Sequence, residues 1–194
     1  MSLRNAGEAF LAYFFFDFRD KEKKQNIRGF LTSLLTQLSA HSKPCCDIIF
    51  HLHSTHGKGS QQASIGVLVN CLEKMLKVVA QQPGYIIIDA LDECPNISGR
   101  PTPRAELLDL LEELIGWRIP NLHICITSRP EVDIKCVLEP LAYGAVSIHD
   151  ESGQKKDICN YVNTVVTSDR RMRKWRNADK EMVVKVVSEK ADGM

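Results

Sequence analysis

The strongest constraint on the fold is the alternation of short apolar segments with longer stretches of helical periodicity. The apolar segments are residues 10–17, 85–89, 122–127 and 145–149. Each has the length of a strand and is apolar almost throughout, and helical stretches separate them. Strands of a parallel sheet that helices cover on both faces have this pattern. The sequence therefore predicts an α/β fold with a parallel sheet flanked by helices.

Apolar residues at helical spacing predict the helices that connect and follow these strands. They are residues 25–39, 46–53, 64–81, 104–116, 131–138, 154–167 and 178–190. The last two follow the final strand with no further strand between them. We therefore assign residues 1–150 to the sheet-containing core and residues 151–194 to a C-terminal helical extension.

Composition excludes several classes of protein. The chain has 194 residues, of which 44% are hydrophobic and 25% charged, as in ordinary globular proteins. A net charge of +1 gives no general attraction to nucleic acid, and no apolar run approaches the roughly 20 residues of a membrane span. The seven cysteines form no CxxC pair, which favours a reducing, cytoplasmic location.

The segment YIIIDALDEC, residues 85–94, carries the clearest chemical signal. Asp89 follows four apolar residues at the carboxyl end of a strand, which is where open α/β sheets bind ligands. A carboxylate there can hold the Mg²⁺ that bridges nucleotide phosphates. Asp92 or Glu93 could orient or deprotonate an attacking water. The alternative, an ordinary acidic turn, fits a lone Asp better than it fits D-x-x-D-E.

The segment HICITSRPE carries the second signal, because Thr127, Ser128 and Arg129 end the next strand. We expect these residues at the same edge of the sheet as Asp89, where Ser128 and Arg129 could contact a terminal phosphate. Pro130 keeps Arg129 out of helical geometry. The alternative is an arginine on the surface at the start of a helix.

Two other groups of residues are not assigned to a binding site. The basic cluster of residues 170–176 around Trp175 could bind phosphates, nucleic acid or an acidic partner, but a solvated connection between two helices explains it better. His41, His51, His53 and His56 match no tight metal-ligand spacing.

These motifs resemble those of a known family. YIIIDALDEC resembles the Walker B strand of NACHT-type signalling NTPases, a branch of the STAND class of P-loop NTPases, and ITSRPE resembles their sensor 1 strand. LAYFFFDFRDKEKKQNIRGFLTSLLTQL, residues 11–38, resembles the segment after the P-loop helix in fungal NACHT proteins. Many of these are described as nephrocystin-3-like N-terminal domain proteins.

The resemblance implies a role for each matched residue. Asp89 becomes the Mg²⁺ carboxylate, Asp92 or Glu93 the water-activating residue, and Arg129 with Ser128 the contact to the nucleotide. The implied cofactors are Mg²⁺ and ATP or GTP. The implied function is a nucleotide-dependent switch in cytoplasmic signalling, which works through protein partners or self-association and without specific nucleic acid or membrane binding.

A phosphate-binding loop, G-x-x-x-x-G-K-[ST], does not occur in the sequence. The one Gly-Lys pair, Gly57-Lys58, is followed by Gly59, and Leu52 stands in the place of the first glycine. In the resembled class the P-loop strand is central in the sheet, so we expect a partial sheet, weak Mg²⁺ binding and no ATP hydrolysis by this chain alone.

Three interpretations remain open on the sequence. The chain is a fragment of a nucleotide switch that has lost hydrolysis, or a non-enzymatic interaction module that pairs its strand edges with another chain. The third interpretation is an incomplete gene model of an active NACHT protein that binds ATP or GTP.

Overall fold

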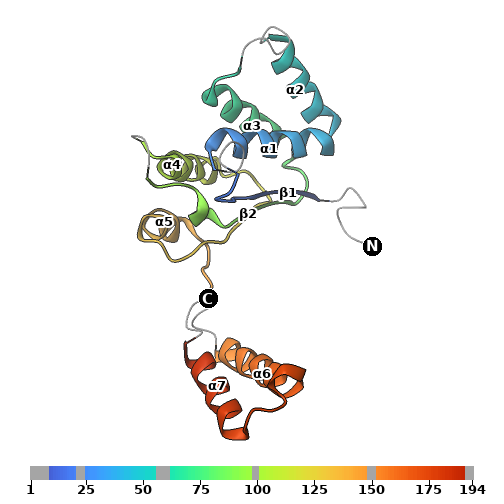
Figure 1. Cartoon of the computed structure of the whole chain (residues 1–194). Helices are drawn as coiled ribbons and strands as arrows, with labels where there is room; N and C mark the ends of the chain where they lie inside the picture. The colour runs from blue at the N-terminus through green and yellow to red at the C-terminus, as the bar shows by residue number, and fades with distance from the viewer. Residues whose placement is uncertain (1–8, 21–24, 56–61, 98–100, 148–151, 191–194) are drawn as a thin grey trace. The chain divides into compact units, whose positions relative to one another are not determined.

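Three of the four predicted strands form one parallel sheet in the computed structural model, which describes residues 9–20, 25–55, 62–97, 101–147 and 152–190. The strands are β1 (Phe10–Phe15), β2 (Gly84–Asp89) and β3 (Leu122–Ile126), in the order β1-β2-β3. Phe15 lies opposite Asp89, and Ile88 lies opposite Ile126. The carboxyl ends therefore meet at one edge, and the predicted α/β class with a parallel sheet is confirmed (Figure 1).

Five α-helices accompany the sheet in the described part of the unit Met1–Ala142. They are α1 (Ile27–His41), α2 (Lys43–Thr55), α3 (Ile65–Val79), α4 (Pro103–Gly116) and α5 (Val132–Leu138). The side chains of Asn26, Ser64 and Thr102 cap α1, α3 and α4 by accepting a hydrogen bond from a first-turn amide. The predicted α2 is longer than expected because proline is tolerated in the first turn of a helix, where Pro44 lies.

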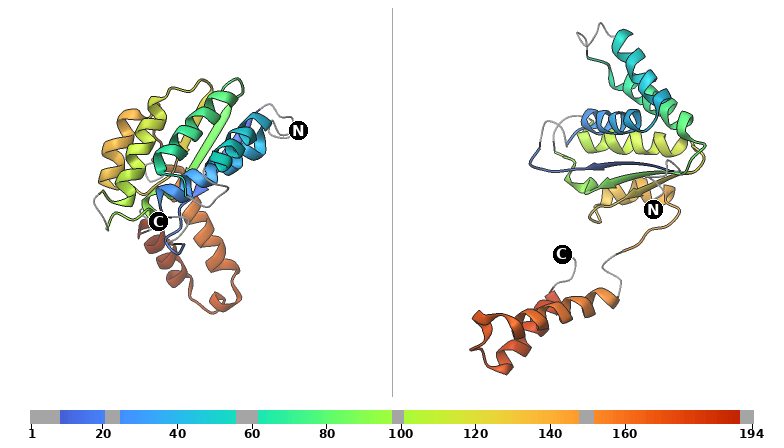
Figure 2. Two further views of the ribbon diagram at one scale, coloured as in Figure 1. Left: turned by 90° about the horizontal axis from the view of Figure 1, so that it is seen from above. Right: turned by 90° about the vertical axis from the view of Figure 1, so that its right-hand side faces the viewer.

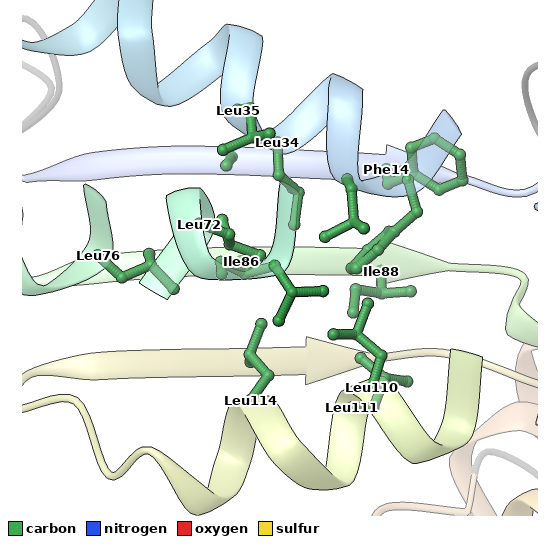
Figure 3. Packing of buried hydrophobic residues seen from close by; sticks show 14 of the residues in the cluster. Phe14, Leu34, Leu35, Leu72, Leu76, Ile86, Ile88, Leu110, Leu111 and Leu114 are labelled. Atoms are coloured by element: carbon green, nitrogen blue, oxygen red, sulfur yellow. The ribbon is translucent and has the colours of Figure 1, made fainter. Parts of the chain in front are cut away.

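Helices α1, α3 and α4 lie together over one face of the sheet (Figure 2). Their leucines meet the inward residues of β1 and β2, as Figure 3 shows for Leu34, Leu72 and Leu111 against Ile86 and Ile88. All five side chains are fully buried. This layer holds the strands in place, and with them the carboxyl ends that carry the polar residues.

The other face of the sheet is more open than the sequence predicts. The sequence predicts strands that are covered on both faces, and this is wrong for the segment Tyr85 to Ile88 because Tyr85 is 42% exposed. On β1, Phe15 is likewise 47% exposed. Burial alternates along β2, with Ile86 and Ile88 inward. The outward residues of β2 are Tyr85, Ile87 and Asp89. The rings of Tyr85 and His123 stack with centroids 5.2 Å apart. Aromatic side chains made the strands look continuously apolar although only alternate residues are covered.

The fourth predicted strand is also wrong in its described part. Residues 145–147 form no strand, and residues 148–149 lie outside the described residues. After α5 the chain makes a short 3₁₀ helix, η3 (Glu139–Leu141), and continues in irregular structure. A segment of three residues with β-type sequence is too short to form a stable strand without a neighbouring strand to pair with.

A side chain covers the middle of the outer edge of β1. Gln37 of α1 accepts a hydrogen bond from the Tyr13 amide at 3.1 Å, and its Nε2 donates to the Tyr13 carbonyl at 2.7 Å. The amide group of Gln37 thus satisfies the outward backbone groups of Tyr13, which a further strand would otherwise use. The described residues provide no such cap for β3 at the opposite edge.

The second unit, Tyr143–Met194, is a helical hairpin. Helices α6 (Ser152–Ser168) and α7 (Asn177–Lys190) are joined through the 3₁₀ helix η5 (Arg170–Met172), so both helices predicted for this part of the chain are present. The basic cluster lies on this connection and is exposed, and Arg176 pairs with Asp179 at 2.9 Å. The bounds of α6 and α7 agree with the predicted ranges to within two residues.

Candidate functional site

The site begins where β2 ends. Ala90 follows Asp89 in the left-handed region, at φ 55°, and the 3₁₀ helix η2 (Leu91–Glu93) starts directly after it. A left-handed residue other than glycine costs about 1–2 kcal/mol, so the surrounding contacts must hold this turn. One of them is the buried side chain of Leu91, whose amide also donates to the Thr127 carbonyl at 3.0 Å.

The ends of β2 and β3 are joined by a hydroxyl group. The Thr127 hydroxyl donates to Asp89 Oδ1, and the same hydroxyl accepts from the Ala90 amide at 3.1 Å. Asp89 is partly exposed, and its other oxygen, Oδ2, has no hydrogen bond among the described residues. The sequence placed Thr127 at this edge without giving it a role, and the structure makes it the residue that orients the Asp89 carboxylate.

Asp92 and Arg129 form the second link between the two strand ends. The Arg129 amide donates to Asp92 Oδ1 at 3.0 Å, and Arg129 Nε lies 3.4 Å from Asp92 Oδ2. The Asp92 side chain is 10% exposed and the Arg129 side chain 80% exposed. Asp92 therefore holds the backbone of Arg129 while most of the guanidinium remains open to solvent, where an anionic ligand could meet it.

Glu93 and Ser128 make contacts of a different kind. Glu93 Oε2 accepts from the Phe18 amide at 2.9 Å, which ties the turn to the segment after β1. The Ser128 hydroxyl donates to the Arg129 carbonyl at 2.8 Å. The structure thus brings all five predicted residues, 89, 92, 93, 128 and 129, to one edge of the sheet, as expected from parallel strands.

Arg104 is a contributor that the sequence did not single out. It lies in the first turn of α4, it is 7% exposed, and its guanidinium reaches the carbonyls of Asp92 and Cys94. A basic residue at a helix N-terminus is disfavoured by the helix dipole, and this misplacement is the signal that could have identified it.

The remaining candidates lie elsewhere. Gly57-Lys58 lies outside the described residues, and the described residues include no group of three or more His, Cys, Asp or Glu side chains that could hold a metal ion. His41, His51 and His53 lie on α1 and α2, away from the acidic turn in sequence and in fold. No described helix is both long and apolar enough to cross a membrane.

The thiol of Cys94, the residue directly after η2, is buried and gives a testable pH dependence. Burial raises the pKa of Cys94 from 9.0 to about 11. Between these values the unfolded chain loses a proton that the folded chain keeps, so the free energy of unfolding falls as the pH rises. The expected slope from this group is about 1.4 kcal/mol per pH unit.

Urea unfolding at pH 8, 9 and 10 measures this slope. The variant Cys94→Ala lacks the group and serves as the control, which cancels the similar effect of burial on the pKa values of Cys45 and Cys71. Above pH 9 the wild-type protein should lose stability faster than the variant. Parallel pH profiles would contradict the assignment.

Comparison with known proteins agrees with part of the resemblance noted in the sequence. The family model described as Nephrocystin 3, N-terminal, matches residues 2–129, which include the three strands and all residues of the acidic turn. No curated protein matches the chain, and no solved structure matches it. The match extends over about two thirds of the 194 residues, and the chain therefore belongs to the nephrocystin 3 N-terminal family.

Proposed function

We propose that this chain carries the metal and sensor half of a nucleotide-dependent signalling switch of the NACHT type, within the STAND class of P-loop NTPases. The observation that carries the proposal is the double link between the strand ends, Asp89 with Thr127 and Asp92 with Arg129. It puts a partly exposed carboxylate and an exposed guanidinium at the ligand-binding edge of a parallel sheet. A metal–phosphate group complements this pair, because the carboxylate would attract the metal ion and the guanidinium would attract the phosphate.

The donor set suits one kind of metal ion. A metal held by protein alone would need several ligands, and the described residues contain no such group. Mg²⁺ instead uses one or two carboxylates and completes its shell with water and substrate phosphates. Asp89, oriented by Thr127, fits a Mg²⁺ ion that arrives with a nucleotide, and that ion would neutralise phosphate charge.

The contacts also separate the roles of the two following acids. Both oxygens of Asp92 face Arg129, so Asp92 serves to hold the arginine. Glu93 uses one oxygen for the Phe18 amide and has no hydrogen bond at Oε1 among the described residues. We therefore assign water activation, in a protein that hydrolyses nucleotide, to Glu93, and phosphate contact to Arg129 with Ser128 beside it.

The sequence has no phosphate loop, and this limits what the chain does alone. Phosphates are wrapped mainly by the backbone amides of that loop, and its lysine reaches them. We propose weak Mg²⁺-dependent binding of ATP or GTP and no hydrolysis by the 194 residues alone. In the cell the switch would act in cytoplasmic signalling, through a protein partner or a second copy.

Titration of the purified chain with a fluorescent ATP analogue, with and without Mg²⁺, tests the proposal. Asp89→Asn removes the metal carboxylate and is expected to weaken Mg²⁺-dependent binding at least about tenfold. Thr127→Val should weaken it in the same direction. The matched control Asp109→Asn changes an exposed residue of α4 and should leave the affinity unchanged. The proposal is contradicted if Asp89→Asn and wild type bind the analogue with equal affinity, or if binding does not depend on Mg²⁺.

A second candidate function is interaction through the edge of β3. The Thr127 amide donates to the Ile88 carbonyl and the Gly84 amide to the Asn121 carbonyl, so odd-numbered residues of β3 bond to β2. By the alternation of a parallel ladder, the amide and carbonyl of Ile124 face away from β2. On the opposite edge of the sheet, Gln37 already occupies the outward amide and carbonyl of Tyr13. This difference favours β3 as the edge that receives a strand of another chain.

Sedimentation over a range of concentrations tests this candidate with a second copy as the partner. Ile124→Pro removes the outward amide and should reduce self-association. Ile124→Ala removes the same side chain but keeps the amide, and it should associate like wild type. A wild-type chain that stays monomeric at all concentrations excludes pairing between copies.

A further inference from the structure

Arg104 is a buried charge in an unfavourable place. It is the second residue of α4, where the positive end of the helix dipole repels a cation, and only 7% of it is exposed. A buried guanidinium is stable only when its donors are hydrogen-bonded and its charge is paired. The contacts of the guanidinium must therefore explain why Arg104 is stable at this position.

The contacts of Arg104 lead to the acidic turn. Nη2 donates to the Asp92 carbonyl at 2.5 Å, and Nε donates to the Cys94 carbonyl at 2.9 Å. The Arg104 amide donates to the Pro95 carbonyl at 3.1 Å. One side chain thus bonds to two carbonyls of the turn, and it holds the backbone of Asp92 while the Asp92 carboxylate contacts Arg129.

The charge of Arg104 is paired with α5. Nη1 lies 3.4 Å from both carboxylate oxygens of Asp133, and Asn96 donates to the same carboxylate at 3.0 Å. Asp133 lies in the first turn of α5, four residues after Arg129. Arg104 and Asp133 therefore complete a ring of contacts that runs from Asp92 through Arg129 to α5 and back to the turn.

We propose that Arg104 is the positioning residue of the site. Its guanidinium fixes the Asp92 backbone, so that the Asp92 carboxylate can hold the amide and Nε of Arg129. Loss of Arg104 frees the turn and lets Arg129 leave Asp92. The effect on Arg129 follows from the geometry alone, whereas the effect on nucleotide binding rests on the function proposed above.

Hydrogen exchange of the Arg129 amide in the full chain reads out the proposal directly. This amide lies in an irregular segment and donates its hydrogen bond to Asp92 Oδ1. In Arg104→Met its exchange is expected to be at least about tenfold faster, as expected for the loss of a single protecting contact. The amides of Ile86 and Ile88 in the centre of the sheet should exchange as in wild type. A purely structural role would instead accelerate exchange throughout the sheet.

Two milder variants keep the proposal open to refutation if Arg104→Met does not fold. Arg104→Lys keeps the charge, but an ammonium group cannot reproduce the fork that reaches two carbonyls and a carboxylate, so it should not rescue the Arg129 amide. Asp133→Asn removes the paired charge and should give a smaller acceleration. If Arg129 exchanges within about twofold of wild type in the folded variants, Arg104 does not position the site.

The fluorescent ATP titration separates this proposal from the proposed function. Where wild type binds the analogue with Mg²⁺, Arg104→Lys should bind it at least about tenfold more weakly. If wild type binds no analogue but Arg104→Lys still frees the Arg129 amide, the nucleotide function fails and the positioning role stands. Normal binding together with unchanged exchange in Arg104→Lys overturns the positioning role alone.

Discussion

Replacement of Ile86 by alanine is expected to lower the free energy of unfolding of the sheet-containing unit by about 2–5 kcal/mol. Ile86 lies in the middle of the central strand and is 0% exposed. Its side chain meets leucines of α3 and α4 (Figure 3), and closely packed helices cannot collapse fully into the space that is left. Urea unfolding followed by circular dichroism measures the loss.

The chain offers a matched control for this change. Ile97 is 94% exposed, and Ile97→Ala removes the same atoms without opening a cavity. Its effect should stay within about 0.5 kcal/mol. Similar losses in the two variants would show that the helices do not pack on this face of the sheet.

Alanine in place of Gly84 is expected to be almost as damaging, at about 3 kcal/mol. Gly84 is the first residue of β2, and a Cβ atom there would overlap the ring of Phe10 on the neighbouring strand. Phe10 is buried, so its ring cannot swing into solvent to make room. The same unfolding measurement applies, and the loss should appear although alanine fits strand geometry better than glycine does.

Two further variants isolate the cause. A Cβ atom added at Gly66 in α3 would have no other atom within 4 Å, so Gly66→Ala should change stability by at most about 1 kcal/mol, in the favourable direction. Combining Gly84→Ala with Phe10→Leu should cost about 1–2 kcal/mol less than the two single changes added together. Strict additivity would exclude the overlap as the cause.

Much of the fold could be predicted because its signals are local. The strand from Phe10, the strand before Asp89 and the strand before Thr127 each show in a short window of apolar residues, and helical spacing marks α1, α3 and α4. Serine, threonine and asparagine at the caps add agreement over three or four residues. Such patterns depend on the chain's own geometry and need no knowledge of what lies across the sheet.

Two local signals were misleading for the same physical reason. Tyr13, Phe15 and Tyr85 give β1 and β2 the appearance of strands buried on both faces, whereas an aromatic ring is also stable when it is half-exposed and in contact with a neighbouring ring. Residues 145–147 have strand-like composition but meet no partner strand. Side-chain burial and strand pairing depend on the neighbouring elements, so the sequence of a single segment does not determine them.

The residues of the candidate site divide in the same way. The sequence by itself determined that acidic groups and an arginine follow adjacent strands, because parallel strands present their carboxyl ends together. Only the tertiary structure decided that Asp89 meets Thr127, that Asp92 meets Arg129, and that Glu93 turns to Phe18. It also brought the unforeseen Arg104 beneath the turn. Hydrogen bonds require the right distance and direction at once, and these pairs are brought within reach only when distant segments pack.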